Sequence, residues 1–213
     1  MALIVTCPPA LEIETIPIPA CLRDFGQITK LVFQRRYSSG TTENIITTAS
    51  TDPAVLATWT TLLTASDGTK VQPSPQVDNS ALESGDPTTY GGGDATAFGL
   101  NKVMAKNPSS FSGEFHSQRQ DVIEAIEKYE GEILSVWLVN EFGHIGGIAD
   151  DLATPLTNKG IPIAPQTFVI KDMEGGKRDS PAMNKISWQF YPGWSKFFNV
   201  IVPTDFNGND LAE

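Results

Sequence analysis

The chain has 213 residues, of which 40% are apolar and 19% are charged, and its net charge is −10 at pH 7. This length is typical of one domain with its own apolar core. An acidic chain without clustered Lys and Arg cannot neutralise DNA phosphates, which excludes a nucleic-acid-binding protein of the basic kind.

The first twenty residues are predicted to form an extended N-terminal arm (residues 1–20). Isoleucine alternates with proline at Ile16, Pro17, Ile18 and Pro19. Each proline disfavours helix and favours extended backbone. We expect the arm to lie on an apolar surface of this chain or of a neighbouring copy, which makes these four residues candidate assembly contacts.

A strand and a helix are predicted next. Residues 28–36 alternate as a strand does, with one face formed by Ile28, Lys30, Val32 and Gln34. A helix is expected after Asp52, which would cap it, and Pro53, which suits the first helical position. Its apolar stripe consists of Val55, Leu56, Trp59, Leu62 and Leu63.

Residues 73–96 are predicted to be a long loop, because proline, glycine and serine are frequent there. Loops of this length are usually functional or disordered, and this one is expected to order on assembly. Its candidate contacts are Tyr90, Gly91, Gly92 and Gly93. The glycines are interpreted as a flexible joint rather than a phosphate loop, because no helix with a Lys-Ser or Lys-Thr pair follows.

The middle of the chain is predicted to form two strands, at residues 97–106 and 110–117, around a turn at Asn107 and Pro108. A helix is then expected over residues 117–130. Ser117 and Gln120 have capping-box spacing, and Gly131 suits the helix end.

The last third is predicted to be mostly strands. Residues 133–139 are almost continuously apolar, which favours a strand covered on both faces, and a hairpin turn at 140–143 leads into residues 144–148. Further strands are expected at 161–171, 184–191 and 197–202, followed by a polar, irregular C-terminal tail at 203–213. Trp194, beside a Pro-Gly turn, and Phe206, in the tail, are further candidate contacts.

Strands do not alternate with helices along the chain, so a parallel α/β sheet is not expected. The sequence predicts a single β-rich domain over residues 1–213, mainly β (α+β). We expect a β-sandwich or rolled antiparallel sheet with a flanking α-helix, the long loop and the N-terminal arm.

No pattern in the sequence predicts catalysis, a cofactor or a metal. His116 and His144 neighbour no plausible nucleophile, and no Gly-x-Ser-x-Gly or Asp-x-Asp-x-Asp pattern is present. Cys7 and Cys21 form no zinc pattern and are expected to be free thiols rather than a disulfide. No signal peptide or membrane-spanning run is predicted either.

The element order and several local phrases resemble structural proteins of tailed bacteriophages, most of all the tail tube (major tail) proteins. The phrases lie at residues 64–71, 89–94, 134–147, 186–195 and 203–207. The resemblance implies a β-sandwich subunit in stacked hexameric rings, which form a hollow tube through which DNA passes without specific binding. Residues 117–130 would be the flanking helix, and residues 73–96 would reach the next ring.

The same resemblance implies that the partners are copies of this chain, with the tape measure and other tail proteins as further partners. The location would be the virion tail, assembled in the host cytoplasm, and no catalytic residue is implied. Other virion parts remain alternatives: a capsid decoration protein, a head–tail connector or a tail terminator. A third alternative is a carbohydrate- or peptide-binding β-sandwich that uses Trp188 and Trp194.

Overall fold

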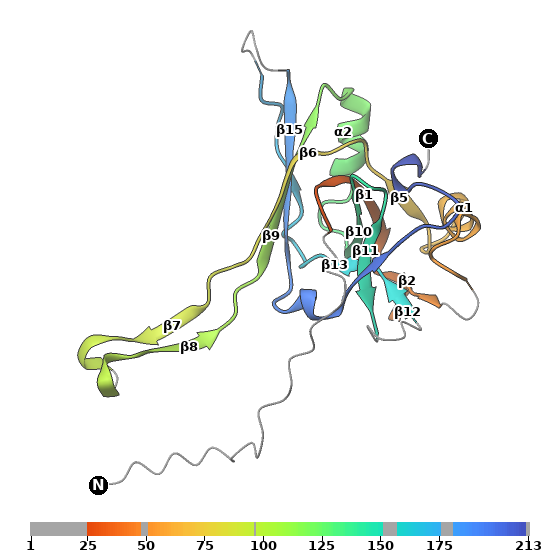
Figure 1. Ribbon diagram of the computed structural model, residues 1–213. Coiled ribbons are helices and arrows are strands. Elements are labelled where there is room, and N and C mark those ends of the chain that lie inside the picture. The colour runs from red at the N-terminus through yellow and green to blue at the C-terminus, as the bar shows by residue number, and fades with distance from the viewer. Residues whose placement is uncertain (1–24, 48–50, 96, 151–156, 176–180, 212–213) are drawn as a thin grey trace.

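The computed structural model describes residues 25–47, 51–95, 97–150, 157–175 and 181–211 (Figure 1). The predicted arm at residues 1–20, with its candidate contacts Ile16, Pro17, Ile18 and Pro19, lies outside the described residues, as do Cys7 and Cys21.

The described strands form two main sheets and two short ribbons, and all of the strand pairs are antiparallel. The larger sheet has the order β4 (Ile46–Thr47), β12 (Thr157–Lys159), β11 (Ile145–Ala149), β10 (Leu134–Asn140), β1 (Ile28–Arg35) and β5 (Val71–Pro73). In addition, β13 (Ile161–Pro162) pairs with β10, and β16 (Phe198–Ile201) pairs with β11.

The smaller sheet has the order β14 (Val169–Ile170), β15 (Met183–Phe190), β9 (Ser109–His116) and β6 (Asp78–Glu83). The ribbons pair β2 (Tyr37–Ser39) with β3 (Thr42–Glu43), and β7 (Thr88–Gly91) with β8 (Asn101–Ala105). The α-helices are α1 (Leu56–Thr64) and α2 (Gln120–Glu127). The prediction of a mainly β, antiparallel fold with a flanking helix is confirmed.

The first core lies between the two sheets. Leu31, Phe33, Val136 and Leu138 of the larger sheet belong to one buried cluster with the apolar side chains of the smaller sheet. Its centre is Trp188, which is 1% exposed and stacks on Phe111 with ring centroids 4.1 Å apart; Phe115, Ile186 and Phe190 complete that layer, and Ile123 and Ile126 of α2 close one end.

The second core lies on the opposite face of the larger sheet. Trp137 of β10 packs edge to face against Trp59 of α1, with ring centroids 5.3 Å apart. The same cluster contains Val32, Ile46, Val71, Val139, Ile145, Ile201 and Leu211. Strand β10 therefore supplies side chains to both cores and is buried along its whole length, as its apolar run predicted.

The prediction that Ile28 shares a face of β1 with Val32 is wrong. The register against β10 shifts between Ile28 and Lys30, so Thr29 is an extra residue, as in a β-bulge. Ile28 consequently joins Leu31 in the first core, whereas Val32 belongs to the second.

Both helices begin later than predicted. Helix α1 starts at Leu56, whose backbone N–H donates to Asp205 Oδ1 at 2.8 Å, so the cap comes from the C-terminal segment and not from Asp52. Helix α2 covers only Gln120–Glu127. Ser117 has a φ of +51° and its N–H donates to the carbonyl of Ala182, so it makes no capping box.

The strand predicted over residues 161–171 is divided. Strand β13 ends at Pro162 and β14 begins at Val169, and a turn closed by the Thr167 N–H to the Ala164 carbonyl lies between them. The two pieces also belong to different sheets, because β13 pairs with β10 and β14 pairs with β15.

The described part of the C-terminal tail is held by the body and is not free. The buried Lys30 Nζ donates to the carbonyls of Asn209 and Leu211, at 2.5 and 3.1 Å. Asn209 Nδ2 donates to the Asn140 carbonyl at 3.0 Å, and Leu211 is only 1% exposed. Hydrogen bonds to a charged donor are stronger than neutral ones, so the tail is firmly anchored up to Leu211.

Leu138→Ala is expected to lower the free energy of unfolding by about 2–5 kcal/mol, because it leaves a cavity between the sheets. Chemical denaturation measures this directly. Ile133→Ala, at a side chain that is 50% exposed, is the control and should cost about 0.5 kcal/mol or less. Equal losses in the two variants would contradict the assignment of the core.

Glu43→Gln is expected to reduce stability at neutral pH only. Burial raises the Glu43 pKa. Hydrogen bonds from Lys159 (2.6 Å) and Arg36 (2.9 Å) lower the same pKa by more than burial raises it, so the net shift is downward from 4.5. A lowered carboxyl pKa contributes stability above the ordinary value, and the contribution is lost as the pH falls through the folded-state pKa. Denaturation at several pH values should show a difference of up to about 1 kcal/mol at pH 7 that disappears in acid; a constant difference would contradict this.

Candidate assembly interface

Strands β6 to β9 form one long hairpin that leaves the body (Figure 1). Close to the body β6 pairs with β9, with Glu83 opposite Ser110. Farther out β7 and β8 pair with each other, from Thr88 opposite Ala105 to Gly91 opposite Asn101. We call residues 84–108 the hairpin arm. The prediction of an irregular loop over residues 73–96 is therefore wrong, because much of that segment is paired strand.

The predicted turn at Asn107 and Pro108 is also wrong, because these residues form a joint where the strand bends. Asn107 Nδ2 donates to the Asp86 carbonyl at 2.7 Å, and Thr88 Oγ1 donates to Asn107 Oδ1 at 3.1 Å. A side chain at Gly85 would place its Cβ 2.3 Å from the Pro108 carbonyl oxygen, so the two strands approach closely here. Pro87 and Pro108 cannot donate to a ladder, which explains the break between the two paired sections.

The tip of the arm is a glycine-rich turn. Gly91, Gly92 and Gly93 have φ values of +109°, +97° and +53°, in the region that favours glycine. These three candidate residues therefore shape the tip. Phe98 also has a positive φ, +67°, which is uncommon for a large side chain and costs conformational energy.

The arm exposes an unusual number of large apolar side chains. The exposed fractions are 85% for Phe98, 67% for Met104, 65% for Leu100, 64% for Val103 and 57% for Tyr90. Thr89 pairs with Val103 and Tyr90 pairs with Lys102, so Val103 and Tyr90 lie on opposite faces of the ribbon. An isolated two-stranded hairpin is marginally stable in water, and exposed apolar clusters mark interaction sites. The arm therefore has the chemistry of a surface that another molecule covers.

The outward face of the smaller sheet has a different character. Its cross-strand neighbours are small and polar or of opposite charge: Ser112 beside Ser187, Ser110 beside Gln189, and Glu114 beside Lys185. Lys185 also bonds Glu174 Oε2 at 2.8 Å, which raises the Lys185 pKa. This face has no excess of positive charge among the paired residues, so it offers little to bind an anion.

The remaining candidate contacts pack mostly within the chain. Trp194 is half-buried and lies 4.9 Å from the Phe190 ring and 5.6 Å from the Phe198 ring. Phe206 is half-buried against the second core. Because Trp188 is buried as well, the aromatic cluster is part of the core and presents no pair of open rings for stacking on a sugar.

The sequence interpretation missed the most exposed apolar residues of the arm: Phe98, Leu100, Val103 and Met104. They were assigned to an ordinary strand. Two features of the sequence could have indicated an exposed hairpin: these residues directly follow a glycine-rich turn, and few other apolar residues lie near them in the sequence to form a core.

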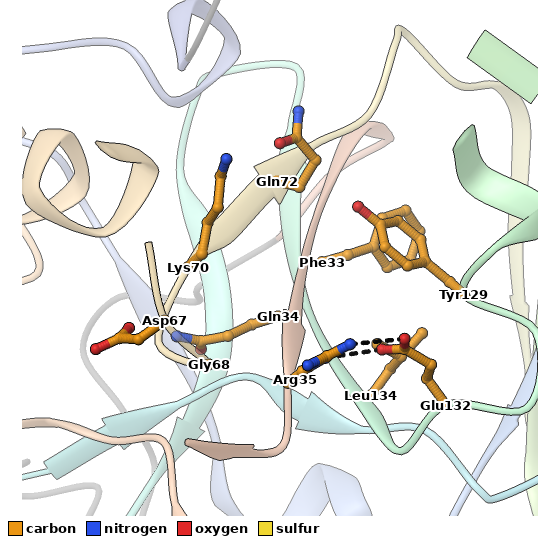
Figure 2. Close-up of a pocket in the computed structure, with 10 residues that line it drawn as sticks. All are labelled: Phe33, Gln34, Arg35, Asp67, Gly68, Lys70, Gln72, Tyr129, Glu132 and Leu134. Atoms are coloured by element: carbon orange, nitrogen blue, oxygen red, sulfur yellow. Dashed lines mark hydrogen bonds and ion pairs between the residues drawn. The ribbon is translucent and has the colours of Figure 1, made fainter. Parts of the chain in front are cut away.

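A pocket of about 250 Å³ lies beside the end of β1 (Figure 2). Arg35 and Glu132 form a bidentate salt bridge in the pocket, with N–O distances of 2.8 and 2.9 Å. Burial raises the pKa of Tyr129, which disfavours its ionisation. Hydrogen bonds from Thr69 lower the pKa of Asp67. The pocket thus contains one ion pair, the further charged side chains of Asp67 and Lys70, and a neutral phenol.

The described residues bring together no group of three or more His, Cys, Asp or Glu side chains that could hold a metal. Within the same residues, no helix is long and apolar enough to cross a membrane. Comparison with known proteins gives no match to a protein-family model, to a curated protein or to a solved structure.

Phe98→Ser is expected to change the free energy of unfolding by less than about 0.5 kcal/mol, because the side chain makes little contact with the body. It should nevertheless weaken self-association, measured by sedimentation velocity over a range of concentrations. Phe142→Ser is the matched control, at a phenylalanine that is 63% exposed in the β10–β11 turn. An equal loss of association in both variants would contradict a specific role of the arm.

Proposed function

We propose that this chain is a structural virion subunit of a tailed bacteriophage, which assembles with copies of itself into the tail tube. The subunits form hexameric rings, the rings stack, and DNA passes through the channel without specific binding. The observation that carries this proposal is the hairpin arm, a projecting ribbon whose apolar side chains are uncovered in the single chain.

The two-layer body supports a role as a rigid building block. The described residues form two buried cores, and the C-terminal segment is anchored up to Leu211. The hairpin arm gathers five exposed large apolar side chains in one segment, which suits a repeated contact between subunits.

The outward face of the smaller sheet supports a role as the channel wall. Serine, glutamine and the balanced pair of Glu114 and Lys185 give a polar surface with no positive excess. The net charge of −10 adds general repulsion of DNA phosphates. DNA could therefore slide along such a face without being held.

Within this proposal the partners are other copies of the chain, the tape measure and other tail proteins. The location is the virion tail, assembled in the host cytoplasm. The arm would serve equally in another virion part, such as a decoration protein, a connector or a terminator. The geometry of the assembly separates these possibilities, because only tube subunits form rings that stack without limit.

The purified chain is expected to form hollow tubes of uniform width in electron micrographs. Replacing residues 85–108 by Asn-Gly should prevent tube formation and leave the body folded. Ser84 and Ser109 continue the register of Glu83 and Ser110, so a two-residue turn can join them. Circular dichroism and thermal unfolding report on the body, and micrographs report on assembly.

The replacement keeps residues 80–83, because they belong to β6, which pairs with the core strand β9. The proposal of a tube would be contradicted by single closed rings, by a flat lattice or by monomers at high concentration. Normal tubes from the shortened chain would contradict the role of the arm.

A further inference from the structure

A groove on the body lies between α2 and the segment that connects β5 to β6. It has a volume of about 420 Å³, and its walls include Pro73, Pro75, Val122, Ala125 and Tyr129. Ala125 is exposed, and the other four are half-buried. We call it the α2 groove. Its walls are mostly apolar, which distinguishes it from the rest of the acidic surface around α2.

One wall of the groove is held rigidly. The Ser74 N–H donates to the Leu31 carbonyl at 2.7 Å, and the Leu31 N–H donates to Ser74 Oγ at 3.1 Å. The prolines on either side of Ser74 restrict the backbone further. The groove is therefore preformed, which reduces the entropy lost when a ligand binds in it.

The groove and the arm are complementary in charge. Asp121 of α2 lines the groove and pairs with Arg119, and the same helix exposes Glu124 and Glu127 outside the groove, followed by the exposed Lys128. The exposed lysines Lys102 and Lys106 flank the apolar residues of β8. Opposite charges at the rim of an apolar contact favour one partner and one register over others.

The arm of a chain points away from its own α2 (Figure 1). The tip and the groove are therefore separate surfaces of one molecule, and the tip of a chain does not reach its own groove. Contacts between two different surfaces of identical subunits are head-to-tail, and they generate rings when the rotation closes or extended stacks when it does not.

We propose that the tip of the hairpin arm binds in the α2 groove of a neighbouring copy. Phe98 and Leu100 enter between α2 and Pro73 and Pro75, and Lys102 faces the acidic side of α2. This rests on the proposed function only in requiring self-assembly, and it names the acceptor surface. A second hollow shares Pro73, Ser74, Pro75 and Val122 with the groove and continues to Lys30, Glu141 and Asn209; more of its lining residues are polar, so it suits an apolar tip less well.

The test uses the full-length chain with the photo-crosslinking residue p-benzoylphenylalanine in place of Phe98. After irradiation of the assembled protein, mass spectrometry identifies the crosslinked peptides. We expect crosslinks between chains to residues 72–76 or 119–129. The same probe in place of Phe142 is the control and should not label these residues.

A second measurement uses substitution in the groove. Ala125→Arg fills the groove with a long charged side chain that blocks the apolar tip, and it is expected to weaken association by about tenfold or more. Ala57→Arg is the matched control, because Ala57 is also an exposed helical alanine and lies in α1, away from the groove. It should leave association unchanged.

The outcomes separate the two proposals. If tubes form but position 98 crosslinks to other residues, or if Ala125→Arg does not weaken association, the groove assignment is overturned. The proposal of a tube is unaffected by either result. Rings or other assemblies with the expected crosslinks would support the groove and overturn the tube. A chain that stays monomeric at high concentration would overturn both.

Discussion

The fold depends on the burial of β10 from both sides. Alternating side chains of one strand enter two different cores: Val136 and Leu138 face the smaller sheet, and Trp137 and Val139 face α1. Because a strand shows successive side chains to opposite faces, a one-residue slip would exchange the two cores. Trp137 would then lie in the space that Val136 and Leu138 fill. The register of β10 with β1 and β11 is therefore strongly determined by side-chain volume.

The C-terminal segment completes the second core and joins distant parts of the chain. Asp205 caps α1, Leu211 fills the apolar layer, and the Lys30 ammonium is satisfied by backbone carbonyls of this segment. A buried ammonium without such partners would be costly, so Lys30 and the segment require each other. The C-terminal segment is therefore part of the body, and the hairpin arm carries five of the large apolar side chains that are exposed among the described residues.

Local patterns predicted much of this fold, and the failures have physical causes. The strands at β1, β10 and β15, the hairpin turn that ends at Gly143 and the presence of helix α2 follow from periodicity and turn chemistry. The bulge at Thr29 and the cap from Asp205 depend on tertiary partners, which the local sequence does not specify. The arm was missed because proline and glycine predict irregular backbone, whereas here they occupy the joint and the tip of a paired ribbon.

An uncovered arm constrains what the protein can do. Apolar side chains on both faces of a ribbon need more surface than one flat contact provides, so a groove or two neighbours must enclose it. In the proposed assembly the body would set the spacing of the subunits, the joint at Asn107 would set the direction of the arm, and the tip would carry the contact. A head-to-tail contact whose rotation does not close would repeat along an axis, which is the geometric requirement of a tube.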